Sequence, residues 1–141
     1  MAPTASKRGK GGTALADQDE GEICMYSKSE AQLLRIFIGE QKHYHSRPLY
    51  EAIVLKAREM GMMGATVLRG PLGFGHSSRL HTAKILRLSE DLPLVIEIVD
   101  TPQKIEGFLP VLDEMMTTGL VTIEKVQILV QPGTAERSSS T

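Results

Sequence analysis

The stretch RPLYEAIVLKAREMGMMGATVLRG, residues 47–70, combines a helix pattern with a strand pattern and decides how the rest of the chain is interpreted. Pro48 suits the first turn of a helix, where its missing N–H has no partner to lose, and Gly61 is a typical stop signal. Five apolar residues between them recur at helical spacing: Leu49, Ala52, Ile53, Ala57 and Met60. Residues 65–70, ATVLRG, form a short apolar run ended by glycine, which indicates a strand.

Three more strands are predicted on either side of this stretch. Residues 33–39, LLRIFIG, are a short apolar run that stops at a glycine. Residues 92–100, LPLVIEIVD, and residues 120–130, LVTIEKVQILV, have the same β-branched, apolar character. The chain therefore offers one strand before the first helix and three after it.

A second helix is predicted over residues 101–119. Thr101 is a suitable N-cap with Pro102 behind it, and Gly119 is the expected end. The apolar residues of this segment fall on one helical face: Ile105, Phe108, Leu109, Leu112 and Met116.

The resulting order, βαββαβ, is that of the ferredoxin-like split βαβ fold, an α+β sandwich. It predicts one four-stranded antiparallel sheet with two helices on one face. The 141 residues suit a single domain, which we expect over residues 29–131. Residues 1–28 and 132–141 lack apolar periodicity and are rich in small and charged residues, so they are predicted to be disordered tails.

The predicted sheet is apolar on both of its faces. The first strand places Leu33 and Phe37 on one side, and the third places Val95 and Val99 there. The other side carries Leu34, Ile36 and Ile38 from the first strand and Leu94, Ile96 and Ile98 from the third. Two helices cover only one face, so the second needs another cover. We expect self-association through that face; the alternative is that flanking loops cover it.

Residues 69–87, RGPLGFGHSSRLHTAKILR, contain four basic side chains and no acidic one. The whole chain has a formal net charge of -1, so this segment is a local positive region on an otherwise negative domain. Such a layout indicates an anion site rather than a nucleic-acid-binding protein. The alternative is a basic loop that forms salt bridges within its own domain.

Three glycines, Gly70, Gly73 and Gly75, stand within this segment at a spacing that fits neither the dinucleotide fingerprint nor the P-loop. Glycines permit close approach of backbone to a ligand and positive φ, and successive amides can form an anion-binding nest. The alternative is a flexible hairpin end. Phe74 is the one aromatic residue here, which is too few for the ring stacking that RNA recognition requires.

Other site classes find little support in the sequence. The single cysteine, Cys24, excludes an internal disulfide framework and a multi-cysteine zinc site. The histidines show no clear metal-ligand spacing, and no nucleophile elbow or paired carboxylates are found. We therefore expect no catalytic residues and no metal site. No apolar run reaches the roughly 20 residues that cross a bilayer, and the N-terminal segment has no secretory pattern. The expected location is the cytoplasm.

The segments ATVLRGPLGFG, SSRLHT and LSEDLPLVIEIVD give the chain a family resemblance. Over residues 33–130 it resembles the PII-like proteins named domain of unknown function 190, relatives of the nitrogen-regulatory PII proteins. The resemblance implies a ferredoxin-like protomer, a homotrimer and a cytoplasmic, non-catalytic signalling role. It also implies a small anionic ligand, often an adenine nucleotide (AMP, ADP or ATP), in clefts between protomers, and no obligatory cofactor.

The resemblance places the ligand at the base of the loop between the second and third strands. The matching positions are Arg69, Gly70, Gly73, Phe74 and Gly75, and we add Glu40, His45 and Arg79 as candidates for the same ligand site. Residues 76–86 correspond to the mobile loop through which PII proteins contact partners, a membrane transporter for example. Residues 117–125, TTGLVTIEK, lack the second glycine-rich phosphate loop of true PII. The loop also lacks the tyrosine that true PII modifies.

Three functions remain to be compared. The favoured one is a trimeric regulatory module whose ligand orders the loop and so alters docking on a partner protein. The second is an enzyme acting on a phosphorylated metabolite with His45, His76 or His81 as acid or base. The third is a nucleic-acid-binding module. A basic glycine-rich loop without paired acid–base groups favours regulation.

Overall fold

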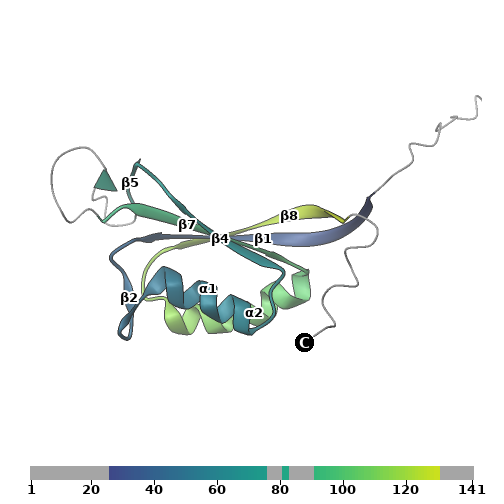
Figure 1. The fold of residues 1–141 in the computed structure, drawn as a ribbon, viewed down its shortest axis with the longest axis horizontal. Coiled ribbons are helices and arrows are strands. Elements are labelled where there is room, and N and C mark those ends of the chain that lie inside the picture. Colours follow the sequence, from purple (N-terminus) through teal and green to yellow (C-terminus); the bar gives the residue numbers. More distant parts are fainter. Residues whose placement is uncertain (1–25, 76–80, 83–90, 131–141) are drawn as a thin grey trace, which may run out of the picture.

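The computed structural model describes residues 26–75, 81–82 and 91–130, and its centre is a four-stranded antiparallel sheet. The strand order is β4-β7-β1-β8, from β4 (Gly64–Arg69), β7 (Pro93–Asp100), β1 (Ser27–Gly39) and β8 (Leu120–Val130). Helices α1 (Leu49–Glu59) and α2 (Pro102–Met115) both lie on one face of this sheet (Figure 1). The predicted βαββαβ order and ferredoxin-like arrangement are confirmed.

Two short hairpins were not predicted. The first, β2 (His43–Tyr44) with β3 (Arg47–Pro48), precedes α1, and the second, β5 (Leu72–Gly73) with β6 (His81–Thr82), follows β4. The first hairpin lies beside α1 on the helix side, whereas β5 rises from the sheet on the side away from the helices (Figure 1). Runs of two residues carry no periodicity, so sequence patterns cannot reveal them.

β1 is longer than the sequence predicted. It begins at Ser27 instead of residue 33, and its first five residues pair with residues 126–130 of β8. β7 ends opposite Gln32, so these paired segments form a two-stranded ribbon beyond the rest of the sheet, here called the ribbon. Residues 27 and 28, expected in the N-terminal tail, belong to this strand. The segment SKSEAQ is polar, and it forms a strand because β8 supplies its backbone partners.

The core lies between the sheet and the two helices. On the sheet it consists of Leu34, Ile36, Ile38, Leu94, Ile96 and Ile98, all buried. α1 contributes Leu49, Ile53 and Ala57, and α2 contributes Ile105, Phe108, Leu112 and Met115. Met60, predicted on the buried face of α1, is 37% exposed, because the helix ends at Glu59 and Met60 is its C-cap.

The buried carboxylate of Asp100 joins three elements at one end of the sheet. Its Oδ1 accepts from the N–H of Thr101 at 2.7 Å, at the start of α2. Its Oδ2 accepts from the N–H of Met63 at 2.7 Å, in the connection between α1 and β4. Lys104 of α2 donates to the carbonyl of Gly61 at 2.8 Å across the same junction. These bonds hold both helices against the sheet.

Gly119 starts the passage into β8 and does not end α2, whose last residue is Met115. Its φ of 145° is one that other residues rarely adopt. A Cβ there would lie 2.4 Å from Cε of Met116 and 3.1 Å from the carbonyl oxygen of Phe37. Glycine therefore allows the turn to approach β1.

Gly119→Ala is expected to lower the free energy of unfolding by about 1–3 kcal/mol, through strain and crowding. The matched control is Gly107→Ala on α2, where an added Cβ meets nothing within 4 Å. That change should raise stability by up to about 1 kcal/mol, because alanine favours a helix interior. Urea unfolding of the two variants at equal protein concentration measures both effects. Equal stability of the two would contradict the role assigned to Gly119.

Candidate functional site

The candidate site lies where the four strands of the sheet meet at one end, here called the strand end. β4 finishes there at Arg69, which pairs with Leu94 near the start of β7. Leu94 pairs with Ile38 near the end of β1, and β8 begins there at Leu120, opposite Phe37. The register therefore brings Arg69 and the residues after β1 to the same end of the sheet.

Arg69 and Glu40, both predicted ligand-binding residues, contact each other at the strand end. The Arg69 guanidinium donates from Nη2 to Oε1 of Glu40. The Arg69 side chain is about half exposed, and Glu40 is more covered. The salt bridge within the domain, considered from the sequence as an alternative, is thus formed by Arg69. A guanidinium has five N–H donors, so Arg69 can contact an anion while keeping Glu40, or can exchange one for the other.

Asp91 adds a second carboxylate to the strand end, which sequence analysis missed. Its Oδ1 accepts from the N–H of Gln41 at 2.8 Å, and the N–H of Glu40 donates to the carbonyl of Leu92 at 2.8 Å. A Cβ on Gly39 would lie 2.6 Å from Oδ1 of Asp91. Asp91 therefore holds the turn after β1 and fixes the backbone from which Glu40 reaches Arg69.

The glycines after β4 pack on Pro93. The N–H of Gly70 donates to the carbonyl of Pro93 at 2.8 Å, so this amide has a partner already. A Cβ on Gly70 or Gly73 would lie 3.1 or 3.0 Å from Cγ of Pro93, whereas one on Gly75 meets nothing within 4 Å. None of the three has the positive φ considered from the sequence; the described glycines that do are Gly61 and Gly119. Close packing explains Gly70 and Gly73.

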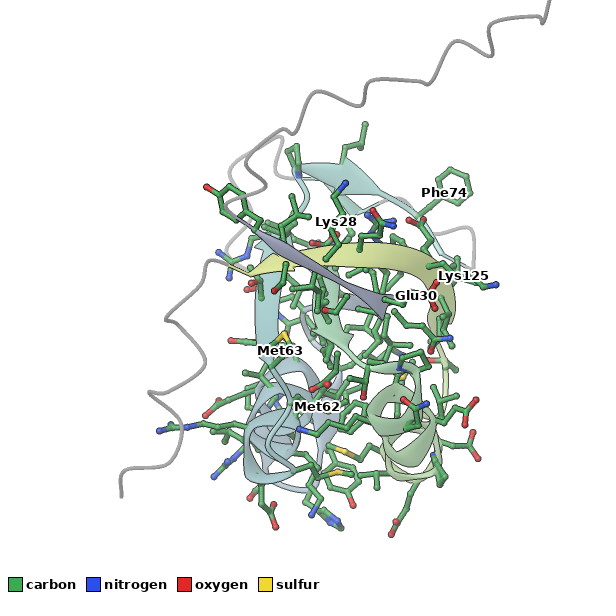
Figure 2. The ribbon with its side chains drawn as sticks, turned by 90° about the vertical axis from the view of Figure 1, so that its right-hand side faces the viewer. Lys28, Glu30, Met62, Met63, Phe74 and Lys125 are labelled. Carbon is green, nitrogen blue, oxygen red and sulfur yellow. The ribbon has the colours of Figure 1, made fainter. Side chains whose placement is uncertain are left out.

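The other predicted site residues lie apart from this pair or outside the described residues. His45, with φ 55°, is in the turn between β2 and β3, and its ring lies edge-on to Tyr44 at 4.3 Å between centroids. That hairpin is on the helix side, so the structure does not join His45 to Arg69 (Figure 1). Phe74 is 71% exposed and points away from the strands (Figure 2). Arg79 and the side chains of the loop, residues 76–86, lie outside the described residues.

The face of the sheet away from the helices, here called the open face, carries an ion-pair network at its middle. Arg35 of β1 donates from Nε to Glu97 at 2.7 Å and from Nη1 to Glu124 at 2.7 Å. The hydrogen bond to Glu97 is the main cause that raises the pKa of Arg35, so its charge is constant at any ordinary pH. Apolar side chains surround the network: Leu33, Phe37, Leu68, Val95, Val99 and Leu120. The alternation of Leu33, Arg35 and Phe37 was a signal that could have placed Arg35 here.

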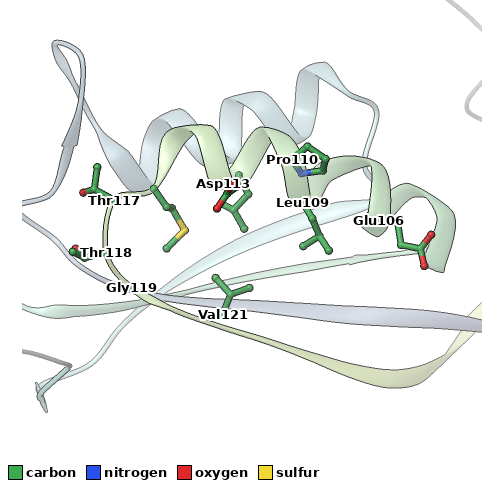
Figure 3. Close-up of a pocket in the computed structure, with 10 residues that line it drawn as sticks. Glu106, Leu109, Pro110, Asp113, Thr117, Thr118, Gly119 and Val121 are labelled. Atoms are coloured by element: carbon green, nitrogen blue, oxygen red, sulfur yellow. The ribbon is translucent and has the colours of Figure 1, made fainter.

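A groove of about 750 Å³ runs between α2 and β8, and sequence analysis did not predict it. Its floor is apolar, from Leu109, Leu112, Met116 and Val121. Glu106 and Asp113 of α2 stand at its rim, and the turn of residues 117–119 closes it at the strand end (Figure 3). This is here called the α2–β8 groove.

Two further kinds of site were tested on the same residues. Across the described ranges, no three histidine, cysteine, aspartate or glutamate side chains are grouped so that they could hold a metal ion. Within those ranges, no helix is both long and apolar enough to span a bilayer.

Comparison with known proteins gives a consistent result. Residues 31–128 match the sequence profile of the family DUF190, described as "Uncharacterized ACR, COG1993". A UPF0166 protein of Aquifex aeolicus (strain VF5) is 36% identical over 98 residues, 70% of this chain and 92% of that protein. A UPF0166 protein of Methanocaldococcus jannaschii is 34% identical over 95 residues, 67% of this chain and 87% of that protein.

Two solved structures share the fold at low sequence identity. One is CPII, a nitrogen regulatory PII-like protein from Thiomonas intermedia K12 bound to ADP, AMP and bicarbonate. It is 19% identical with a TM-score of 0.50, over 72% of this chain and 91% of CPII. The other, from Thermus thermophilus and described as PII-like, is 16% identical with a TM-score of 0.51, over 75% of this chain and 94% of its own. The fold is PII-like.

Gly73→Ala tests the packing explanation for the glycines. The added methyl group presses on the ring of Pro93, so we expect a loss of about 1–2 kcal/mol in the free energy of unfolding. Gly75→Ala, with no neighbour to meet, should cost less than half of that. Adding Pro93→Ala to Gly73→Ala should recover part of the loss, which a double-mutant cycle in urea measures. No coupling between positions 73 and 93 would contradict the packing explanation.

Proposed function

Because the chain belongs to the DUF190 family and has a PII-like fold, we propose that it is a trimeric regulatory protein that binds an adenine nucleotide between protomers. Residues 76–86 would then dock on a partner protein, for which a membrane transporter is one candidate. The observation that carries this proposal is the position of Arg69, at the strand end where the chain leaves the sheet for the loop. The ADP and AMP bound to CPII support the ligand class.

The open face supports the trimer. Phe37 is 36% exposed, and Leu68 and Leu120 are at least half exposed around the Arg35 network. An apolar face of this kind is usually covered by another protein surface. Two charged glutamates around one arginine leave a local charge of -1, so a covering copy must be oriented to accommodate it. A second copy of the same face meets both requirements.

The two edges of the sheet suggest how a cleft between protomers would form. In the described part of the chain, β4 and β8 are the outer strands, and they run antiparallel. A head-to-tail contact repeated by rotation closes into a ring. Such a contact between the β8 edge of one copy and the β4 edge of the next sets Arg69 of the latter beside residues 117–119 of the former. The ligand would bind between them.

A regulatory role needs only a ligand that binds two loop states differently. An enzyme would need titratable groups that converge on a substrate, and His45 lies with Tyr44 on the helix side. His76 and the side chain of His81 lie outside the described residues, so the enzymatic alternative would depend on them. We propose a non-catalytic protein of the cytoplasm.

Phe37→Glu tests the trimer. A charge in the middle of the apolar part of the open face cannot be buried without a large desolvation cost. We expect light scattering to give three times the 15.4 kDa chain mass for the wild type and a single chain for the variant at micromolar concentration. The matched control is Leu55→Glu on α1, where the side chain is 38% exposed on the other side of the molecule.

Leu55→Glu should leave the trimer intact, because the helix side is not part of the proposed interface. A wild-type protein that is monomeric at micromolar concentration would reject the trimer. A trimer that survives Phe37→Glu would place the interface elsewhere.

Calorimetric titration of AMP, ADP, ATP and cyclic AMP tests the ligand site. Arg69→Ala should weaken binding about 10- to 100-fold, since it removes charge-assisted hydrogen bonds worth roughly 1.5–3 kcal/mol. Glu40→Gln should strengthen binding up to about fivefold, because it removes a surface salt-bridge partner worth about 0–1 kcal/mol that competes with the anion. Lys42→Ala, an exposed cation after the same turn, is the control and should change little.

If none of these nucleotides binds the wild type below about 1 mM, some -4 kcal/mol, the nucleotide proposal fails. If Arg69→Ala binds normally but unfolds more easily, Arg69 is a structural partner of Glu40 and nothing more. Opposite effects of Arg69→Ala and Glu40→Gln are the specific signature of the proposed site.

A further inference from the structure

The α2–β8 groove has a use that the nucleotide proposal does not require. Its floor is apolar and its rim carries carboxylates, so it suits an extended segment with both small apolar and basic residues. We propose that the N-terminal segment of the same chain, residues 7–16, KRGKGGTALA, lies in this groove. This proposal is independent of the nucleotide and of the trimer.

Charge complementarity is the first argument. Glu106 and Asp113 both belong to the lining of the groove and both are exposed residues of α2 (Figure 3). Residues 7–10, KRGK, carry three positive charges, and the first acidic residue of the chain is Asp17. A segment of this composition next to two carboxylates gains Coulomb attraction in a site that is partly shielded from water.

The apolar floor is the second argument. Leu109, Leu112 and Met116 of α2 face Val121 of β8, which is 37% exposed because α2 does not cover this edge of the sheet. Residues 11–16, GGTALA, combine small side chains with one leucine. Burying a leucine side chain contributes roughly 1.5–3 kcal/mol, which is enough for a contact that is already held near by the chain.

The reach of the chain is the third argument. α2 follows Asp100, which pairs with Gln32, five residues along β1 from Ser27 and therefore about 17 Å from it. Val121 lies nine residues before Val130 on β8, or about 30 Å along the strand. Lys10 is 16 residues before Tyr26. A glycine-rich coil of that length would have an end-to-end distance of about 20–25 Å, which falls within the span of the groove.

The order of charges along the way is a fourth argument. Residues 17–22, DQDEGE, carry four acidic side chains and stand between the basic segment and the ribbon. The ribbon side of the route carries Lys28 and Lys125, with Glu30 between them (Figure 2). The acidic part of the segment thus meets a net positive ribbon before the basic part reaches the acidic groove.

The segment is particular to this chain among the relatives compared. The 98 matched residues make up 92% of the Aquifex aeolicus protein, so that protein has no room for a segment as long as residues 1–26. A chain-specific segment over a groove of the shared fold would act as a removable cover of that groove.

Paramagnetic relaxation enhancement tests the proposal on the full-length chain. A nitroxide is attached to Ser6→Cys in a Cys24→Ser background, where it is the sole thiol. The expected result is at least a twofold loss of amide signal for Leu109, Asp113 and Val121, with Leu55 of α1 unchanged. Raising NaCl to about 0.5 M, where the Debye length is only a few ångströms, should restore most of the signal.

A matched pair of rim variants separates the groove from general attraction. Glu106→Lys with Asp113→Lys should abolish the signal loss, whereas Glu51→Lys with Glu59→Lys on α1 makes the same charge change and should preserve it. The salt response of the wild type keeps the test valid if a rim variant fails to fold. Signal loss that is even over the surface, or that survives the groove variants, overturns the proposal. Loss that appears only when labelled and isotope-enriched chains are mixed overturns it too, since the occupant would then come from a second copy.

Discussion

The structure depends on one constraint: its sheet is apolar on both faces, and the two helices cover only one of them. The covered face makes the core, with Leu34, Ile36 and Ile96 fully buried against α1 and α2. The open face repeats the apolar pattern with Phe37 and Leu68 and interrupts it once, with Arg35 held between two glutamates. A face of that kind favours association, and the ion-pair network restricts which surfaces can associate with it.

The same sheet determines where a ligand would bind. Because all four strands meet at the strand end, the register joins Arg69 to Glu40 without any contact from the loop. The pair is exposed and its free energy is small, so an anion can compete for the guanidinium. Asp91 and Pro93 hold the backbone on either side of the pair. A charged contact that can be exchanged, at the base of a loop, is a suitable element for a ligand-controlled switch.

Much of the fold follows from sequence periodicity, and the exceptions have physical causes. The helices were found because their apolar residues repeat at helical spacing and because Pro48 and Thr101 mark their starts. The start of β1 was missed because residues 27–32 are polar and become a strand only through pairing with β8. Met60 was misplaced because a C-cap residue no longer follows the helical face.

The candidate site was harder to predict than the fold. Composition singled out Arg69, but its contact with Glu40 depends on strand register, which sequence periodicity does not give. Gly70 and Gly73 have the flexibility that a ligand loop needs, yet their neighbour Pro93 explains them by packing. The Arg35 network and the α2–β8 groove also arise from residues distant in sequence. Long-range pairing decides these features, and local patterns contain no record of it.

The central claim is that a second copy covers the open face, and hydroxyl-radical footprinting of the full-length protein tests it most directly. Phe37 and Leu55 are 36% and 38% exposed in the single chain, so they should be modified to similar extents if both stay in water, once each rate is normalised to the unfolded chain. The account predicts strong protection of Phe37 and none of Leu55. Modification of Phe37 at the level that its exposure in one chain allows would contradict it.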